Sequence, residues 1–599
     1  MKKIYLIALT VVFVLTGCND FLDSTNYTGK DSENFPSSEQ DVNQMVAAVY
    51  AASFNSPLTG NDVSAYFYLA NLAADDQLGG GSESTDKSTT ALDFMMYNKD
   101  TDGEAQWNAC YSAIARANSA LASVDNVADE TLRNQTKGEL QVLRAYNYFT
   151  LAQMFGNVPM VEAAPDNIDE ANIAPEQVDA KEVYKKIASD LYNAAEIMPS
   201  YKYGSSNLSY GHVTRWAAEA LLARVWLFYT GFYEQSSLPT DEADGVPAEI
   251  TKAMVIAKLE DCIENSGHDL LPDFRSLWAY SNKFTKYSEV TSAKDITCAT
   301  GCPNNWNDNN AENIMAIAFT YLSAWSSTQL HLTNQYALFC GIRAGNWQDD
   351  EKYNKDGKGS VYPFGTGWGA GPVSASLVND WKAAEPNDPR REYSILTKPD
   401  DYDYTNEGEQ MQLTPYHQKK VCAVRSGGGE VGEGKTGYYT FGAQQFGSGE
   451  TGHFQASHPQ DLILIRFADV LLMHSELTET ADGMNRVRAR VGLPAVTYSE
   501  TALRNERRWE LAFEALRWGD IRRWHIAPEC LDKQLGQTIY NNNSATPTTN
   551  TAQGGGYSAR YNATNGFFRI PQTQIDLSAG AYKQNAGWEG TSGRYNGWQ

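Results

Sequence analysis

Residues 137–161, KGELQVLRAYNYFTLAQMFGNVPMV, decide the fold class of this chain. Apolar side chains recur on nearly every face of a 3.6-residue period, which predicts a helix packed on several sides. Gly156 supplies the left-handed turn that ends such a helix, and Pro159 prevents the helix from resuming. Arg144 lies inside the apolar pattern and needs a partner, because a buried unpaired guanidinium is too costly. The stretch predicts a core helix of an α-rich domain, with no catalytic role.

Further helical patterns flank this stretch on both sides. They lie at residues 38–54, 62–73, 104–124, 181–198, 213–229 (closed by Gly231), 251–265, 462–477 and 499–524. Successive amphipathic helices with short joints favour an α-solenoid of tetratricopeptide type, although no strict repeat of about 34 residues is visible. We therefore expect a mainly α protein whose helical scaffold covers about 37–272 and 460–530.

Residues 273–459 have a different composition. Glycine, asparagine and aromatic residues dominate there, residues 314–319 resemble a strand, and ten glycines fall between Gly427 and Gly452. Long irregular segments of a compact protein tend to carry function. We expect a large loop-rich part with short strands, which belongs with the scaffold to one domain of residues 37–599.

The N-terminus begins MKKIYLIALTVVFVLTGCND. Its apolar run, residues 4–15, is too short to cross a bilayer as a helix, which takes about 20 residues, but it suits a secretory signal. Leu15-Thr16-Gly17-Cys18 matches a bacterial lipoprotein box. We predict a signal peptide at 1–17, a lipid on Cys18 and a tether at 18–36. No second apolar run of spanning length follows, so we expect a lipid-anchored, otherwise soluble protein.

Charge and composition narrow the range of partners. The chain has a net charge of −25, with 42% hydrophobic and 12% aromatic residues. So acidic a protein has no electrostatic route to nucleic acid or to anionic headgroups. Cys298 and Cys302 could form a small loop disulfide. Their spacing, with no matching His or Cys pair, is a poor zinc signal.

Several motifs together resemble a known family. They are CNDFLD from Cys18, RAYNYFTLAQMFGNVPMV at 144–161, GHVTRWAAEALLARVWLF at 211–228, DPRRE at 388–392, LIRFADVLLMHSE at 464–476, ERRWELAFEALRWGDIRRW at 506–524, and FFRIPQTQI and KQNAGW near the C-terminus. In this order they resemble the SusD/RagB-like outer-membrane lipoproteins, the starch-binding type of surface glycan-binding protein. The resemblance implies a tetratricopeptide-like scaffold, a shallow glycan site on the less regular half and display at the cell exterior. It also implies a partner, a SusC-like TonB-dependent barrel that receives the oligosaccharide.

Sugar rings stack on aromatic planes, and their hydroxyls need polar partners, so a glycan site needs exposed Trp or Tyr among Asn, Asp and Gln. Trp306, Trp347 and Trp368 lie in polar or glycine-rich loops, and Asn305 and Asn307 flank the first of them. We predict that these residues bind a neutral oligosaccharide or polysaccharide, and that Trp306→Ala abolishes or severely weakens binding with little change in melting temperature. Each indole could instead be a loop anchor folded onto the body.

The resemblance adds two carboxylates to the predicted site, because the family often uses the loop after its early helix. Asp75 and Asp76 occupy that loop and could accept sugar hydroxyls; the alternative is a pair of solvated loop carboxylates. Trp216, Trp226, Trp509, Trp518 and Trp524 lie in helical patterns instead and are predicted to be scaffold.

Two motifs suggest other chemistry and fail on context. Residues 429–436, GEVGEGKT, match the phosphate-loop pattern, but residues 437–442, GYYTFG, do not start a helix, and Glu430 and Glu433 would oppose phosphate. Asn354 to Gly357 matches part of a calcium loop, but Lys352 and Pro363 occupy ligand positions. We predict no cofactor and no metal, although an irregular Ca²⁺ site among the loop carboxylates stays open. The charged run 504–523 is interpreted as an ion-pair seam with pairs three and four residues apart.

We expect a non-catalytic binding protein. One alternative is an exported glycoside hydrolase, whose two carboxylates would flank the bond at about 5 Å or about 6.5–9.5 Å. The alternating strand–helix order of a (β/α)₈ barrel is absent from the sequence. The other alternative is a helical-repeat scaffold that binds only proteins.

Overall fold

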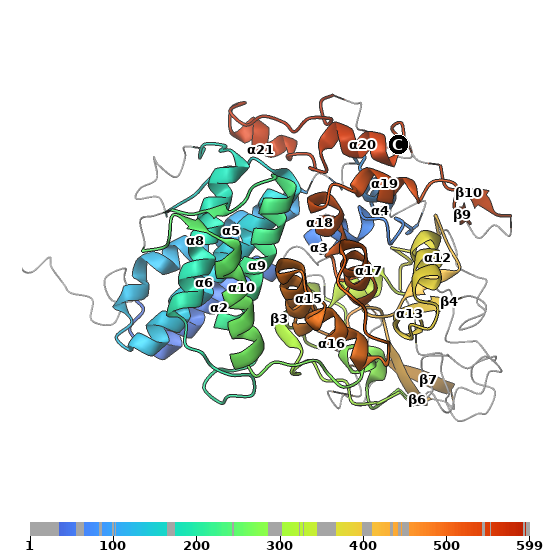
Figure 1. Ribbon diagram of the computed structural model, residues 1–599, viewed down its shortest axis with the longest axis horizontal. Helices are drawn as coiled ribbons and strands as arrows, with labels where there is room; N and C mark the ends of the chain where they lie inside the picture. The colour runs from blue at the N-terminus through green and yellow to red at the C-terminus, as the bar shows by residue number, and fades with distance from the viewer. Residues whose placement is uncertain are drawn as a thin grey trace, which may run out of the picture.

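A computed structural model describes most of the chain (Figure 1). The described residues are 35–55, 65–82, 87–98, 101, 103–163, 174–241, 245–285, 302–322, 324–326, 329–343, 364, 367–397, 410–431, 435–440, 442, 445, 455–541, 546–551, 553–590 and 594. Cys18, Trp347, Cys298 and the calcium-like stretch at 354–357 lie outside them. No helix among the described residues has the length and apolar character that a membrane crossing requires.

The central helix, α6 (Glu130–Phe155), forms as the sequence predicts. Asp129 caps its start by accepting a hydrogen bond from the Leu132 backbone amide at 2.8 Å. Gly156 ends it with φ 68°, a conformation that favours glycine. Arg144 has the expected partners, because its guanidinium donates to both Asp190 carboxylate oxygens at 2.7 and 2.6 Å and to Asn118 Oδ1 at 2.7 Å.

Six further helices extend the stack from α6 in nearly sequential order (Figure 1). They are α2 (Glu39–Asn55), α5 (Glu104–Ser123), α8 (Ala180–Ile197), α9 (Arg215–Phe232), α10 (Lys252–Asn265) and α15 (Phe467–Thr478), and α16 (Asp482–Arg490) packs on α15. Of these, α2, α5, α8 and α9 contact α6, α10 packs on α9, and α15 packs on α10. This is the predicted tetratricopeptide-like stack. One predicted boundary is wrong, since α9 continues through Gly231 to Phe232.

The described strands form five two-stranded antiparallel ribbons. They are β1 (Leu238–Pro239) with β2 (Glu249–Ile250), β3 (Asn313–Ile317) with β8 (Leu462–Arg466), β4 (Ile395–Thr397) with β5 (Tyr416–Gln418), β6 (Arg425–Val431) with β7 (Lys435–Thr440), and β9 (Thr538–Ile539) with β10 (Thr548–Thr549). The phosphate-loop pattern lies on the β6–β7 hairpin, where Gly429 is paired with Gly437. Its last two residues, Lys435 and Thr436, begin strand β7, whereas a phosphate loop leads into a helix.

The predicted helix at 462–477 is wrong at its start. Residues 462–466 form β8, and α15 begins only at Phe467. Every residue of β8 is buried, with Asn313 of β3 opposite Arg466 and Ile317 opposite Leu462. A continuous apolar run cannot distinguish a buried strand from a buried helix by periodicity, and here the pairing with β3 decides the outcome.

Shorter elements complete the loop-rich half and the C-terminal region. They are α3 (Tyr66–Leu72), α4 (Lys87–Asp93), η2 (Val124–Asn126), η4 (Phe274–Leu277), η5 (Ala279–Ser281), η7 (Leu330–Leu332), α11 (Gln335–Phe339), α12 (Ala375–Ala384), α13 (Arg390–Ser394), α17 (Glu500–Glu510), α18 (Arg517–Arg523), α19 (Ala527–Asp532), α20 (Tyr557–Thr564) and α21 (Gln572–Leu577). The predicted single helix at 499–524 is therefore wrong. Phe513 and Ala515 have φ values of 68° and 60° between α17 and α18, which no right-handed helix contains.

The ion-pair seam exists, but it is mostly tertiary rather than local. Arg390 pairs with Glu506 at 2.6 Å, and Arg466 pairs with Glu510 at 2.6 Å and Glu514 at 2.7 Å. These partners come from segments far apart in the sequence and lie in the core, where an unpaired charge would be strongly destabilising. The seam joins the loop-rich half to the helices that carry the C-terminal motifs.

Candidate functional site

The asparagine-rich segment holds its tryptophan inward. Trp306 is only 7% exposed and belongs to the main hydrophobic core, and its backbone amide donates to the Ser281 carbonyl at 3.2 Å. Asn305 and Asn307 on either side are exposed. Asn305 Oδ1 accepts from the Ser276 hydroxyl at 2.7 Å, and Asn307 Nδ2 donates to the Asn309 carbonyl at 3.0 Å. The prediction of Trp306 as an exposed ring is wrong, because the indole is a loop anchor.

Trp368 is half-buried against the loop-rich half. Its ring meets Phe339 edge to face, with centroids 4.6 Å apart, and its backbone amide donates to the Leu338 carbonyl at 3.0 Å. A Cβ at Gly367 would lie 2.2 Å from the Gly341 Cα, so only glycine lets the two segments approach this closely. Trp368 thus keeps part of its surface available and remains a candidate for stacking.

Asp75 and Asp76 are buried, with 0% and 3% exposure. Arg517 Nε lies 2.7 Å from Asp75 Oδ1, and Arg508 Nη2 lies 3.0 Å from Asp75 Oδ2. Arg508 Nε also lies 2.8 Å from Asp76 Oδ1. Both carboxylates are therefore structural ion-pair partners. Their prediction as hydroxyl acceptors is wrong, because a glycan cannot reach them.

The pKa directions of the two groups follow from this geometry. Burial alone would raise the pKa of Asp75, but Arg508 and Arg517 overcome it and hold that pKa well below its ordinary value. Burial raises the pKa of Asp76, and Arg508 offsets only part of the effect. One arginine shared between two carboxylates cannot satisfy both equally.

The loop that carries the two aspartates does lie beside Trp368. The Gly81 backbone amide donates to the Gly369 carbonyl at 3.1 Å, and the Leu78 amide donates to the Pro372 carbonyl at 2.8 Å. The structure thus brings together two regions that the sequence suggested separately. Trp347 lies outside the described residues, so its role stays a prediction. Among the described residues, no three His, Cys, Asp or Glu side chains form a group suited to a metal ion.

The sequence analysis missed Trp325, which is 51% exposed and the most exposed of the described tryptophans. Two backbone hydrogen bonds lie nearby: the Thr320 amide donates to the Leu332 carbonyl at 2.7 Å, and the Leu322 amide donates to the Ala456 carbonyl at 3.1 Å. Leu332, 39% exposed, lies at the end of the same loop. The only sequence signal was a tryptophan among serines and threonines outside any helical pattern.

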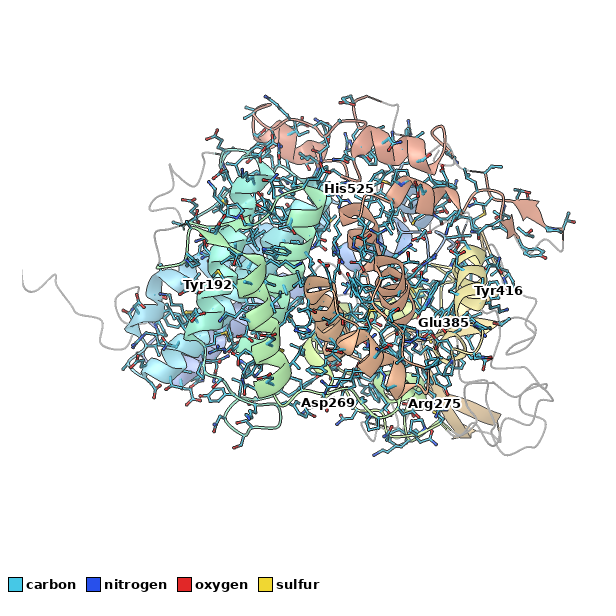
Figure 2. All side chains as sticks on the ribbon, viewed as in Figure 1. Tyr192, Asp269, Arg275, Glu385, Tyr416 and His525 are labelled. Atoms are coloured by element: carbon cyan, nitrogen blue, oxygen red, sulfur yellow. The ribbon has the colours of Figure 1, made fainter. Side chains whose placement is uncertain are left out.

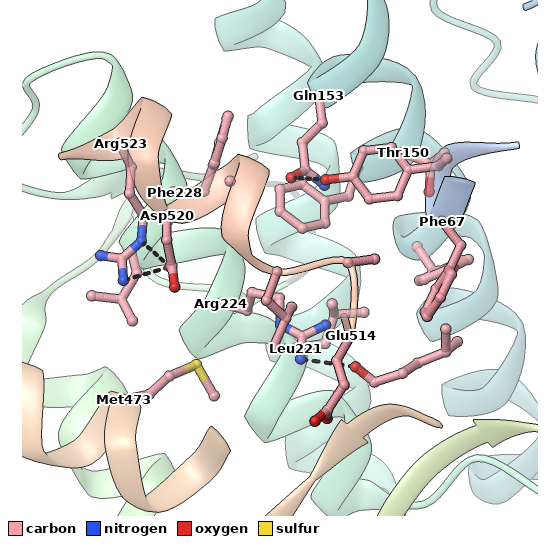
Figure 3. A pocket seen from close by; sticks show the side chains of 18 of the residues that line it. Phe67, Thr150, Gln153, Leu221, Arg224, Phe228, Met473, Glu514, Asp520 and Arg523 are labelled. Atoms are coloured by element: carbon pink, nitrogen blue, oxygen red, sulfur yellow. Dashed lines mark hydrogen bonds and ion pairs between the residues drawn. The ribbon is translucent and has the colours of Figure 1, made fainter. Parts of the chain in front are cut away.

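A cavity of about 70 Å³ lies between the helical stack and the C-terminal helices (Figure 3). Arg224 of α9 and Arg523 of α18 reach it, and Arg523 pairs with Asp520 there (Figure 3). Burial would raise the pKa of nearby Asp469, but Arg224 and Arg507 hold it at about 2. Water shares about 30 Å³ per molecule in the liquid, so this space suits a few waters and is no glycan trench.

The fold and these surfaces define a helical-repeat scaffold with exposed aromatic rings on the loops that it supports. Two family models match this chain. Residues 20–227 match a family described as starch-binding and associating with the outer membrane, and residues 304–588 match the SusD family. The chain belongs to the SusD/RagB-like family.

Individual relatives are similar to this chain over nearly its whole length. The chain is 23% identical over 572 residues to SusD-like protein P2 of Formosa agariphila, covering 92% of this chain and 94% of the relative. Among solved structures, a laminarin-binding SusD-like protein has a TM-score of 0.66 at 24% identity, covering 92% of this chain and 99% of that one. Surface glycan-binding protein A from Bacteroides thetaiotaomicron, in complex with laminarihexaose, has a TM-score of 0.62 at 18% identity, covering 91% and 99%.

Proposed function

We propose that this protein is a non-catalytic, lipid-anchored protein of the outer membrane. It binds neutral oligosaccharide or polysaccharide at the cell exterior and delivers it to a SusC-like TonB-dependent barrel. Family membership supports the class of function, and solved relatives named for laminarin or glycan binding support carbohydrate as the ligand.

The exposed indole of Trp325 carries the proposal for this chain. A half-exposed indole offers a flat apolar face on which a sugar ring can stack. Trp368, which packs against Phe339 of α11, offers part of a second ring. A glycan that spans several sugars would use more than one such face.

The test is affinity electrophoresis through gels containing laminarin or other neutral polysaccharides. Trp325→Ala should weaken retardation, with Kd about tenfold higher, because it removes one stacking face. Leu577→Ala is the matched control, since Leu577 is 77% exposed and lies on α21, outside the proposed site. Unchanged retardation of Trp325→Ala on every glycan that binds the wild type would remove Trp325 from the site.

Two further measurements separate the alternatives. Sustained release of reducing sugar by the pure protein would favour a glycoside hydrolase. No retardation on any glycan would favour a scaffold that binds only proteins. Copurification of a TonB-dependent barrel from detergent-solubilised membranes tests the delivery step directly.

A further inference from the structure

A groove of about 240 Å³ lies between the loop that joins α8 to α9 and strand β3. One wall comes from the loop at 201–214, and the other is formed by His268, Asn309, residues 313–316 and Ala318. None of Trp306, Trp325 and Trp368 lines it. Asn309 belongs to the asparagine-rich run that the sequence analysis singled out, so part of that run faces this groove.

Tyr201, Tyr203 and Tyr210 line the groove, and the rings of Tyr203 and Tyr210 are held by their hydroxyls. The Tyr203 hydroxyl donates to the Asn309 carbonyl at 3.2 Å, and the Tyr210 hydroxyl donates to the Asp461 carboxylate. Tyr210 is nevertheless 47% exposed and Tyr203 is half-buried. The Tyr203 ring also packs against the His268 ring, with centroids 5.2 Å apart. The Tyr210 ring is fixed at its edge and stays exposed, and a pre-ordered ring loses little entropy when a ligand stacks on it.

The loop itself is anchored at both ends. The Tyr203 backbone amide donates to the Ser266 carbonyl at 2.8 Å, and the Val213 amide donates to the Tyr50 hydroxyl at 2.7 Å. His212 Nδ1 lies 3.0 Å from Glu139 Oε2. The groove is therefore formed before any ligand arrives.

The polar groups of the groove have hydrogen-bonding capacity to spare. Asn313 is 8% exposed; its Nδ2 donates to the Asp308 carbonyl at 2.7 Å, while its Oδ1 has no partner among the described residues. His268 Nδ1 lies 2.9 Å from the Ala311 carbonyl, which can only accept, so Nδ1 carries the hydrogen and Nε2 of the neutral ring is an acceptor. Buried acceptors without donors favour a ligand that brings hydroxyl groups.

The charges around the groove are mixed. Lys202 and His212 line it, and the carboxylates of Glu139 and Asp461 lie behind the residues that they hold. No field of one sign therefore favours an anionic or a cationic ligand. Apolar side chains of Ile314 and Met315 from β3 complete the lining.

We propose that this groove, which neither Trp325 nor Trp368 lines, is a second saccharide site that binds a short neutral segment of the same glycan. Tyr203 and Tyr210 supply ring faces, and Asn313 and His268 accept hydrogen bonds from sugar hydroxyls. This inference rests on glycan binding as the proposed function. Two separate sites on one chain would raise the affinity for a polysaccharide through multivalency.

The test uses affinity electrophoresis with laminarin, amylopectin, galactomannan and xylan as neutral probes. The double variant Tyr203→Ala/Tyr210→Ala removes both ring faces. Ala318→Arg places a long side chain at an exposed position of the groove while keeping every hydrogen bond described above. Tyr192→Ala is the control, because Tyr192 is a half-buried tyrosine on α8 that does not line the groove. In Figure 2 it lies apart from Asp269, the residue after His268 of the groove. Melting temperatures of all variants check folding.

Both groove variants should bind at least one glycan about tenfold more weakly than the wild type. When either is combined with Trp325→Ala, the combined protein should bind glycan more weakly than Trp325→Ala alone. If both groove variants match the wild type on every glycan that retards it, the second site is refuted and the proposed function stands. If no glycan retards the wild type, the proposed function fails, and the groove proposal fails with it.

Discussion

Asp93 offers a pH-dependent test of how the loop beside Trp368 is held. It is 1% exposed at the end of α4, and its Oδ2 accepts from Gln412 Nε2 at 2.7 Å and from the Tyr557 hydroxyl at 3.0 Å. The backbone of Gly79 also donates to it. Burial raises the pKa of Asp93 from 3.8 to about 7, and these neutral donors only partly offset the effect.

The direction of the pH dependence follows from that raised pKa. The folded state favours the neutral carboxyl, so the contribution of Asp93 to stability is complete below about pH 4 and is lost as the pH rises toward about 7. A shift of about three pKa units corresponds to about 4 kcal/mol. The unfolding entropy is about 2.1 cal/mol/K per residue, so in a chain of this length that free energy shifts the melting temperature by about 3 °C.

Asp93→Asn keeps the shape of the protonated side chain and cannot ionise. The melting temperature of Asp93→Asn minus that of the wild type should therefore rise by about 3 °C between pH 4.5 and pH 8. Differential scanning fluorimetry of both proteins across that range measures it, and titrations of other groups cancel in the difference. A difference that stays constant with pH would show that Asp93 does not ionise in this range and would refute the argument.

Asp380→Asn is the matched control with the opposite sign. Burial would raise the pKa of Asp380, but its bonds to Arg508 at 2.8 Å and Lys533 at 3.0 Å hold that pKa below its ordinary value. Its contribution to stability is present above about pH 4 and is lost as the pH falls further. The Asp380→Asn protein should therefore be less stable than the wild type throughout pH 5 to 8. Its melting temperature minus that of the wild type should not rise with pH.

Burial and the N-terminal motif give three further predictions. Trp306→Ala should lower the free energy of unfolding by about 3–5 kcal/mol, measured by denaturant unfolding, while the folded protein keeps wild-type glycan retardation. Arg144→Met should cost about 3–5 kcal/mol in the same assay, because Asp190 then keeps only Lys186 at 3.5 Å. Its control, Arg504→Ala, breaks an exposed pair with Glu500 and should change stability by less than about 1 kcal/mol. Cys18→Ala should move the protein out of the membrane fraction, as shown by immunoblotting; retention there would contradict the lipid anchor.

The helical frame was largely predictable because its signals are local. The apolar period of α6, the Gly156 terminus and the requirement of Arg144 for a partner can all be read within one stretch of sequence. The identity of that partner could not, because Asp190 lies 46 residues away on the next helix of the stack. The break between α17 and α18 was equally hidden, since Phe513 and Ala515 are not residue types that signal a positive φ.

Burial of charge explains why Asp75 and Asp76 were misplaced. A polar, glycine-rich loop is normally solvated, and these two carboxylates gave no local sign of anything else. Their partners Arg508 and Arg517 lie more than 400 residues further along the chain and reach the loop only through the tertiary fold. The same arginines had seemed to belong to a helix with internal pairs three and four residues apart. Both errors have one cause, because sequence spacing finds only local partners.

The tryptophans show why polar neighbours are a poor guide to an exposed ring. Where a loop lies flat on the protein, neighbouring side chains alternate between solvent and core, as they do in an extended strand. Asn305 and Asn307 are both exposed, which directs Trp306 between them toward the core. Trp325 has no such asparagine pair, and Ala324 beside it is exposed as well. Asparagines on both sides of a tryptophan therefore favour a buried ring that anchors the loop. A ring available for stacking is better sought at a tryptophan that has no such polar pair beside it.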